Sequence, residues 1–432
     1  MLPSPKQSLN YGVRRREVFG WALYDFANSG YTTVVLTAVF NAYFVGVVAG
    51  GASWGTFAWT LALGLSNAIV MVTMPVLGAW ADLRAAKKKL LVMATAGCVL
   101  ATALLALAGP GDLWLAVAAI VASNICYAWG ESLIAAFLPE LARREAMGRV
   151  SGWGWSFGYF GGMLTLGLSL AYVIWAQGQG QSAAQFVPVT MLITASVYAL
   201  AALGTFVLLR ERAVPQEVGA RLVARRAWLR LSQTWHESRR YQDFSWLLLC
   251  SVFYMAGIAV VIALAAVYAE QVLGFQQQQT MMLVFLVNIA SALGAFGFGY
   301  LQDRIGHRPA LALTLWGWVL MTVLAVLATT HAVFWAAAVV AGLCMGSSQS
   351  AGRAMVGLFA PPDRLAEFFG LWTFAVRLSA IVGPITYGLV TLVTGGNHRI
   401  AILTTGLFFL AGLVVLRRVD VARGTAAAQA AG

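Results

Sequence analysis

Long apolar runs alternate with short polar loops along almost the entire chain. Most runs hold roughly 18–25 residues without a charge, enough for a helix that rises about 1.5 Å per residue to cross a ~30 Å hydrocarbon core. The pattern therefore predicts an all-α membrane protein with twelve transmembrane helices. The expected spans are Phe19–Val48, Trp54–Trp80, Leu90–Leu107, Leu113–Leu138, Val150–Ala176, Phe186–Leu209, Phe244–Ala269, Thr280–Leu301, Pro309–Ala328, Ala332–Phe359, Ala366–Val393 and Ile400–Leu416.

The second six spans repeat features of the first six. Asn67 precedes Asp82 by the same spacing as Asn288 precedes Asp303, and GESLIAAFLPE from residue 130 aligns without gaps on GRAMVGLFAPP from residue 352. A parallel repeat of six and six helices is a transporter architecture, with the substrate site between the halves near the middle of the membrane. We expect an N-terminal six-helix bundle over residues 1–210, a cytoplasmic basic linker over residues 211–243 and a C-terminal bundle over residues 244–432.

The composition and the charge distribution agree with a membrane protein. The chain is 60% hydrophobic and 10% charged, whereas soluble domains are about 25% charged. The net charge is +12, and nearly all Lys and Arg residues outside the spans lie at the termini or in alternate loops, with Arg399 as the exception. By the positive-inside rule this distribution places both termini in the cytoplasm. The positive charge therefore reports the topology of an integral, multi-pass protein of the cell (inner) membrane and not binding to nucleic acid.

The sequence lacks the patterns that an enzyme requires. It contains no nucleophile–base motif, no cluster of metal ligands and no glycine-rich phosphate loop. We interpret the four cysteines as packing residues, because each stands alone in a different apolar run: Cys98, Cys126, Cys250 and Cys344. We therefore expect a protein that is not an enzyme, needs no cofactor or metal, and works as a monomer that binds a small molecule in the lipid bilayer.

The loop after the eighth span carries the most specific motif. GYLQDRIGHR, from Gly299 to Arg308, resembles the loop motif of the major facilitator superfamily, in which Gly, three residues, Asp, Arg, one residue and Gly precede basic residues. The first-half copy, GAWADLRAAKKK from Gly78, departs from the motif at Leu83 and Ala85. The resemblance implies the major facilitator fold and a conformational latch, with Asp303 pairing with the eleventh helix when the transporter faces outward. The gate residues that it implies are Asp82, Asp303, Arg304 and Arg308.

Three further stretches narrow the resemblance to one branch of the superfamily. WALYDFANSG from Trp21, EFFG from Glu367 and the pair Gly383-Pro384 resemble the branch once labelled unknown major facilitators, which includes fungal vacuolar amino-acid effluxers. The resemblance implies a secondary transporter that exports a small polar solute, such as an amino acid or another zwitterion, by alternating access, with protons as the candidate coupling ion. A lipid or lysolipid transporter and a multidrug exporter on the same fold stay open as alternatives.

Four charged residues lie deep inside the predicted spans: Asp25 in the first, Glu131 in the fourth, Arg353 in the tenth and Arg377 in the eleventh. Counted from the nearest loop at about 1.5 Å per residue, all four lie roughly 12–15 Å inside the membrane. Charged residues at such depth are costly, and they normally face the protein interior and mark functional sites. Two acids and two arginines at one level predict a site for a zwitterion, in which Asp25 and Glu131 are also the candidate proton carriers.

The same residues permit a purely structural interpretation. The four charges could form ion pairs between the halves that only gate or stabilise one conformation, and Asp25 could be a first-turn partner of the helix dipole if the first span begins late. Three neighbouring polar and aromatic residues complete the predicted substrate site: Tyr24, Asn28 and Trp372. In the linker, Arg221–Trp235 alternates leucines and tryptophans with arginines, which fits either an amphipathic helix on the membrane surface or a solvated basic loop.

Overall fold

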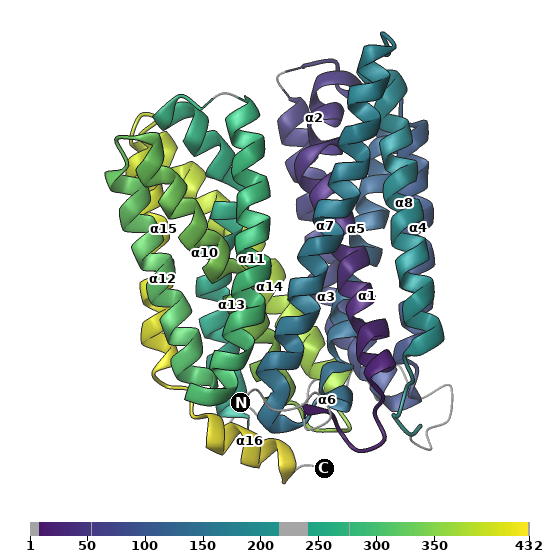
Figure 1. Cartoon of the computed structure of the whole chain (residues 1–432), viewed down its shortest axis with the longest axis vertical. Helices are drawn as coiled ribbons and strands as arrows, with labels where there is room; N and C mark the ends of the chain where they lie inside the picture. The colour runs from purple at the N-terminus through teal and green to yellow at the C-terminus, as the bar shows by residue number, and fades with distance from the viewer. Residues whose placement is uncertain (1–7, 53, 216–240, 276, 431–432) are drawn as a thin grey trace.

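The computed structural model describes residues 8–52, 54–215, 241–275 and 277–430. Within these residues, twelve helical segments are long and apolar enough to cross a membrane, and Figure 1 shows them standing side by side in two bundles. The predicted all-α fold with twelve spans is therefore confirmed. The linker stretch Arg221–Trp235 lies outside the described residues, so its amphipathic helix stays a prediction.

The first bundle comprises the spans that precede the linker. Its elements are α1 (Arg15–Tyr31) with the continuing segments η2 (Thr32–Ala38), α2 (Phe40–Tyr43) and η3 (Phe44–Val48), then α3 (Gly55–Arg84), α4 (Lys87–Leu104) with η4 (Leu105–Leu107), α5 (Leu113–Ala135) with α6 (Leu138–Leu141), the turn η5 (Arg144–Ala146), α7 (Met147–Gly178) and α8 (Ala183–Leu208). The second bundle consists of α10 (Gln242–Leu273), α11 (Gln277–Ile305), α12 (His307–Leu327), α13 (His331–Phe359), α14 (Leu365–Val393) and α15 (His398–Leu416), followed by the short helix α16 (Val421–Gln429).

The first span differs from the uninterrupted helix that its apolar pattern predicts. Two of its segments, Thr32–Ala38 and Phe44–Val48, are π-helical. Such wide turns are rare and are often found at functional sites. Neither segment contains proline, and only the second contains a glycine, Gly46, so the residue types do not predict both changes in helix type.

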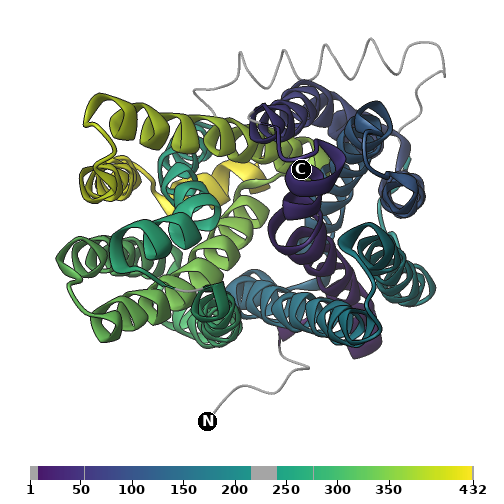
Figure 2. The same cartoon turned by 90° about the horizontal axis from the view of Figure 1, so that it is seen from above.

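The two bundles contact each other most closely at the end of the molecule that holds both chain termini (Figure 1). Two helix pairs, α3 with α14 and α7 with α11, make most of this contact, and α7 also contacts α13. We call this end of the molecule the closed end. At the opposite end the ribbons of the two bundles lie farther apart (Figure 1), and the view from above shows the bundles as two separate groups of helices (Figure 2).

Large apolar side chains cover the outer faces of the bundles. Helices α4, α8, α12 and α15 each present exposed leucines, including Leu100, Leu200, Leu320 and Leu407. Exposed apolar side chains in such number would be unfavourable in water, but they suit contact with lipid chains. These helices are the third, sixth, ninth and twelfth spans, and all four lack acidic and basic residues in their central parts.

The turn between α3 and α4 contains a strained residue. Ala85 has a φ of 48°, and within the described residues no other non-glycine residue has a positive φ. The corresponding turn of the second half has Gly306, with a φ of 94°. A left-handed conformation costs a residue with a Cβ about 1–2 kcal/mol, so the departure from the loop motif at Ala85 carries an energetic penalty.

We predict that Ala85→Gly stabilises the protein by about 1 kcal/mol, because it removes the left-handed strain at the expense of some added freedom in the unfolded chain. Thermal unfolding of the purified protein measures the effect. Gly306→Ala is the matched control and should lower the melting temperature. A lower melting temperature for Ala85→Gly would contradict the assignment of strain to this turn.

Candidate functional site

The four intramembrane charges form two ion pairs, and each pair joins the two bundles. Asp25 on α1 pairs with Arg353 on α13, and Glu131 on α5 pairs with Arg377 on α14, each with an N–O distance of 2.7 Å. In this conformation each of the four charges therefore has a partner in the opposite bundle. Helix α1 begins at Arg15, so Asp25 lies well inside the helix and the alternative of a first-turn dipole partner is wrong.

Arg353 is enclosed by residues of the first bundle. Its side chain is 3% exposed, and it donates from Nε to Ser151 Oγ at 3.1 Å and from Nη2 to the Ser151 carbonyl at 2.8 Å. The guanidinium lies 4.6 Å from the ring of Trp21 and 5.3 Å from the ring of Trp155, within the range of cation–π attraction. A buried charge requires this degree of pairing. Together with Asp25, these contacts fasten α13 to α1 and α7.

Glycines on α7 make room for this arrangement. A Cβ at Gly154 would lie 2.5 Å from Asp25 Oδ2 and 2.5 Å from the ring of Trp21, and a Cβ at Gly158 would lie 3.1 Å from the Asp25 carbonyl oxygen. Small residues let membrane helices approach closely. The position of Asp25 beside Arg353 therefore depends on the absence of side chains at these two glycines.

The second pair is more open and less completely bonded. Glu131 is 34% exposed and Arg377 is 12% exposed. Arg377 donates from Nη2 to Glu131, whereas its buried Nε has no hydrogen-bond partner in the described part of the chain. The guanidinium lies 5.8 Å from the ring of Tyr127, which stacks on Tyr31 at 5.1 Å between ring centroids. Solvent reaches this pair, and Arg377 has donor capacity left for a ligand.

Tyr24 and Asn28, both predicted as substrate ligands, are buried inside the first bundle. The hydroxyl of Tyr24 lies 2.8 Å from Thr95 Oγ1 on α4, and Tyr198 on α8 donates to Asn28 Oδ1 at 2.7 Å. Helix α1 therefore turns both side chains toward the lipid-facing helices of its own bundle. Their contact with substrate stays a prediction, because the structure holds both side chains in contacts within their own bundle. The apolar pattern of the first span did not reveal which side of the helix faces the other bundle.

Trp372, the third of these predicted ligands, lies within the second bundle and is 7% exposed. It packs edge-on against Phe369 of the same helix, with 6.2 Å between the ring centroids. A Cβ at Gly352 would lie 3.6 Å from its ring, so Trp372 fills the space beside the residue that precedes Arg353. These contacts make Trp372 a packing neighbour of the first ion pair.

Asp82, at the end of α3, caps the start of α14 in the opposite bundle. Its Oδ1 accepts from the N–H of Ala366 at 3.1 Å and its Oδ2 from the N–H of Glu367 at 2.9 Å. The first N–H groups of a helix lack partners within the helix and carry the positive end of its dipole, so a carboxylate is favourable there. A Cβ at Gly370 would lie 2.9 Å from the Met74 carbonyl oxygen, which shows how closely the two backbones meet.

Asp303, at the end of α11, caps the start of α7 in the same way. It accepts from the N–H of Gly148 at 2.9 Å, from the N–H of Arg149 at 3.2 Å and from Arg149 Nε at 2.6 Å. The predicted pairing of Asp303 with the eleventh span is therefore wrong. The two-fold relation of the halves brings the eighth span to the fifth, and Asp82 on the second span is the residue that meets the eleventh.

The two arginines of the loop motif do not join this contact. Arg304 and Arg308 are both exposed, and Asp303 forms its ion pair with Arg149. In this conformation the predicted gate therefore consists of the two aspartates and the helix starts that they cap, while Arg304 and Arg308 lie outside it.

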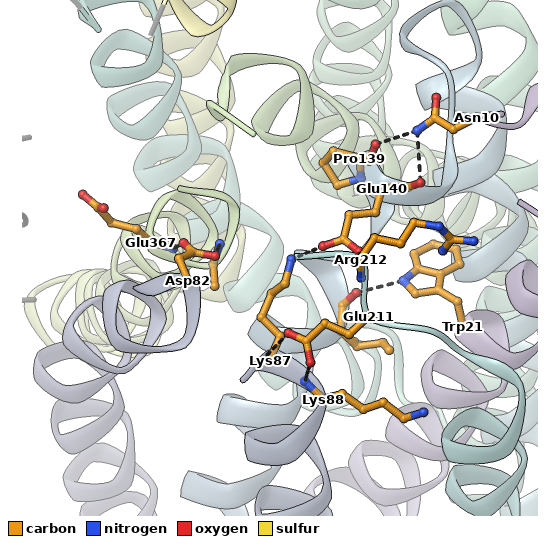
Figure 3. A network of polar contacts seen from close by, with 12 residues as sticks. Asn10, Trp21, Asp82, Lys87, Lys88, Pro139, Glu140, Glu211, Arg212 and Glu367 are labelled. Atoms are coloured by element: carbon orange, nitrogen blue, oxygen red, sulfur yellow. Dashed lines mark hydrogen bonds and ion pairs between the residues drawn. The ribbon is translucent and has the colours of Figure 1, made fainter. Parts of the chain in front are cut away.

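A polar network beside the start of α4 holds the chain that follows α8 (Figure 3). Glu211 accepts from the N–H groups of Lys87 at 2.8 Å and Lys88 at 3.1 Å. Glu140 forms an ion pair with Lys87 and accepts from the N–H of Arg212 at 3.3 Å. Burial raises the pKa of the Glu211 carboxyl, and the N–H groups of Lys88 and Lys87 oppose that rise. The network fixes the start of the linker to the first bundle.

A family profile described as "Vacuole effluxer Atg22 like" matches residues 144–429, about two thirds of the chain. The chain belongs to this family. A profile of the Major Facilitator Superfamily matches residues 3–166, so the resemblance drawn from the loop motif is confirmed. This member of the Atg22-like family is a membrane transporter, integral to the membrane and crossing it many times.

Curated relatives of the transporter include a bacterial and a fungal protein. The "Uncharacterized MFS-type transporter YxiO" of Bacillus subtilis is 26% identical over 92% of this chain and 93% of its own length. "Autophagy-related protein 22-1" of Aspergillus niger is 25% identical over 46% of this chain and 34% of its own length. The match thus spans about a third of the fungal protein.

Solved structures show the fold of this Atg22-like transporter in distant proteins. The human organic anion transporter MFSD10 superposes with a TM-score of 0.73 at 16% identity, covering 93% of this chain and 99% of that one. A bacterial homologue of the iron transporter ferroportin, in an outward-facing state, superposes with a TM-score of 0.70 at 13% identity, covering 94% and 99%. At these identities the likeness concerns the fold alone.

We predict that Gly154→Ala destabilises the folded protein by about 1–3 kcal/mol, because the added methyl group overlaps Asp25 and Trp21 of the neighbouring helix α1. The melting temperature of the purified protein measures the loss. Gly167→Ala on the same helix is the matched control, since a Cβ there meets nothing within 4 Å, and it should be neutral or stabilising by up to about 1 kcal/mol. An equal loss in both variants would contradict the role given to Gly154.

We predict that Asp303→Asn opens the closed end more than Asp82→Asn does. Both changes weaken a helix cap, but only the first also breaks an ion pair, the one with Arg149, and a hydrogen bond between two charged groups is stronger than one between neutral groups. The labelling rate of a cysteine introduced at Ser350, which is 1% exposed, measures the opening. Faster labelling with Asp82→Asn than with Asp303→Asn would refute the ranking.

Proposed function

We propose that this transporter moves a small solute carrying both a positive and a negative charge, such as an amino acid, by alternating access. In this proposal Glu131 and Arg377 bind the solute, and Asp25 and Arg353 form a lock between the bundles. The observation that carries the proposal is the difference in solvent access. The side chains of Glu131 and Arg377 are 34% and 12% exposed, against 11% and 3% for Asp25 and Arg353.

A zwitterion has the groups needed to replace each partner in the exposed pair. Its carboxylate would bind Arg377, whose planar guanidinium suits two parallel hydrogen bonds and whose Nε has no partner among the described residues. Its amine would bind Glu131. Because the exchange leaves neither protein charge unpaired, it avoids the penalty of leaving one member of the pair without a partner, a penalty that solvent at Glu131 makes smaller than in a fully buried pair.

The lock and the two helix caps must open before the bundles can separate at the end that holds the termini. A solute shifts this equilibrium only if it binds the two conformations with different affinity. Glu131 and Arg377 belong to different bundles, so a solute held between them responds to any change in their separation. Protonation of Glu131 would also release Arg377, which makes Glu131 the first candidate for proton coupling and Asp25 the second.

The basic residues support an orientation for this cycle. Arg149, Arg212, Arg308 and Arg417 belong to the end of the molecule that holds both termini, and the positive-inside rule assigns that end to the cytoplasm. The conformation with this end closed is then outward-facing. A bacterial relative supports placement in a cell membrane, and the effluxer description of the family supports export as the direction.

A ligand panel read by thermal stability tests the proposed solute, because a ligand that binds the folded state alone raises the melting temperature. The panel tests each amino acid beside two analogues. One is its amide, which lacks the negative charge, and the other is the corresponding acid without the amino group, which lacks the positive charge. The expected result is that the zwitterion raises the melting temperature more than either analogue with a single charged group. Stabilisation by lysolipids or apolar drugs, and by no zwitterion, would overturn the proposal in favour of a lipid transporter or a multidrug exporter.

We predict that Arg377→Gln weakens binding of the stabilising solute by about tenfold or more, because a hydrogen bond to a charged group contributes about 1.5–3 kcal/mol. Glu131→Gln should remove the preference for the amine and any dependence of transport on a proton gradient. Arg353→Gln is the matched control, since it removes the same charge from the lock. It should speed cysteine labelling at position 350 and change solute affinity by only a few-fold.

The assignment of one pair to solute binding and the other to the lock is wrong if the two arginine variants show each other's effects. Loss of solute binding in Arg353→Gln, together with normal binding in Arg377→Gln, would make Asp25 and Arg353 the binding pair. Normal transport by the Glu131→Gln and Arg377→Gln variants would exclude the exposed pair from substrate binding altogether.

A further inference from the structure

Arg308, the last residue of the loop motif, lies on a groove on the outside of the second bundle. The groove runs between α12 and α15 and has a volume of about 120 Å³. Three residues of α12 and three from the end of α15 line it: Arg308, Ala312, Trp316, Leu413, Leu416 and Arg417. This position leaves Arg308 without a part in the contact between the bundles, so the proposed transport cycle does not explain it.

The groove combines a basic mouth with an apolar floor. Arg308 is the second residue of α12, and Arg417 directly follows the last residue of α15, so both arginines lie at the same end of these two neighbouring helices. Ala312 lies one turn farther along α12, and its small side chain leaves the floor of the groove open. Leu413 and Leu416 form the opposite wall.

Trp316 extends the apolar floor deeper into the membrane. It lies eight residues beyond Arg308, which corresponds to about 12 Å along a helix. Its side chain is 55% exposed, although tryptophan in membrane proteins usually lies at the interface with water. At this depth the exposed indole faces the region that lipid acyl chains occupy.

The arginines at the mouth are available to an anion. Neither Arg308 nor Arg417 forms an ion pair with an acidic side chain of the described residues. A nearby carboxylate, Asp420, accepts a hydrogen bond from the N–H of Arg423 at 3.0 Å. That bond, with a smaller effect of Arg308, holds the pKa of Asp420 below its usual value. Asp420 is thus engaged in capping α16.

We propose that this groove binds one anionic phospholipid. Its phosphate lies between Arg308 and Arg417, and one acyl chain runs past Ala312 and Leu413 to the indole of Trp316. Basic pockets between transmembrane helices suit anionic head groups, and the apolar floor suits an acyl chain. A soluble anion would use the two arginines and gain nothing from the floor. The site is independent of the proposed substrate, because it lies on the outer face of a single bundle.

The test titrates the purified full-length protein in detergent with phosphatidylglycerol or phosphatidylcholine and counts bound lipid by native mass spectrometry. We expect one phosphatidylglycerol to bind at least about tenfold more tightly than phosphatidylcholine, because two basic residues attract the anionic head group. The double variant Arg308→Gln/Arg417→Gln should lose this difference. Equal affinity for the two lipids in the unaltered protein would overturn the proposal.

Two further variants separate a built site from general attraction to a basic surface. Arg418→Gln removes one positive charge next to Arg417, but Arg418 lies over the ring of Trp246 at 5.8 Å and outside the groove, so binding should stay unchanged. Ala312→Phe fills the groove without changing the charge, so binding should be lost. A loss with Arg418→Gln as large as that of the double variant would overturn the proposal, and so would unchanged binding with Ala312→Phe.

Inorganic phosphate and melting curves complete the test. Inorganic phosphate at the concentration of the lipid should not displace phosphatidylglycerol. Displacement would overturn the proposal, because it would show that the two arginines bind phosphate without a contribution from the apolar floor. Melting temperatures of the variants without added lipid, close to that of the unaltered protein, show that each variant is folded.

Discussion

Polar groups that leave water need partners, and at the closed end of this transporter the partners belong to the opposite bundle. The first N–H groups of α7 and α14 are satisfied by Asp303 and Asp82, each from the other half. The guanidinium of Arg353 is satisfied by Asp25 and Ser151 in the same way. Separation of the bundles leaves all of these groups without partners unless water reaches them. Closing and opening are therefore exchanges of protein partners for water, and apolar packing alone does not decide between them.

The two ion pairs differ in how many protein contacts water must replace when the bundles separate. Arg353 has its donors occupied and aromatic rings on its faces, so its release involves several contacts at once. Arg377 has one hydrogen bond, and its acid partner is already in contact with solvent. The two pairs thus have similar chemistry, but the pair of Arg353 is held by more contacts and is less exposed to solvent than the pair of Arg377.

The apolar runs predicted the twelve spans because run length alone determines whether a helix can cross the membrane. They did not predict the π-helical turns of the first span, since neither segment contains proline and only one contains glycine. The spacing of charges within spans placed Asp25, Glu131, Arg353 and Arg377 at one level, but the pairing between them depends on lateral helix packing. The burial of Tyr24 and Asn28 on the far side of α1 was equally hidden, because a membrane helix is apolar on every side and its pattern does not reveal which side faces a partner helix.

The loop motif shows which contacts a sequence repeat can predict and which it cannot. It identified Asp82 and Asp303 as equivalent residues at the closed end, and the structure gives them equivalent contacts. It did not reveal that equivalence under a two-fold axis exchanges the partners, so that the second span meets the eleventh and the eighth meets the fifth. It also could not separate Asp303, which contacts the other bundle, from Arg308, which lies five residues later on the outer face.

The glycines at the closed end determine how closely the two bundles can approach each other. Gly78, Gly152, Gly299 and Gly370 each leave no room for a Cβ against the backbone of the opposite bundle. A single methyl group at any of them would act as a wedge that blocks closure at one end and leaves the other end free to close. If the bundles rock as proposed, such a wedge acts by steric exclusion and independently of the charged pairs, and it leaves the proposed binding pair accessible from one side of the membrane only.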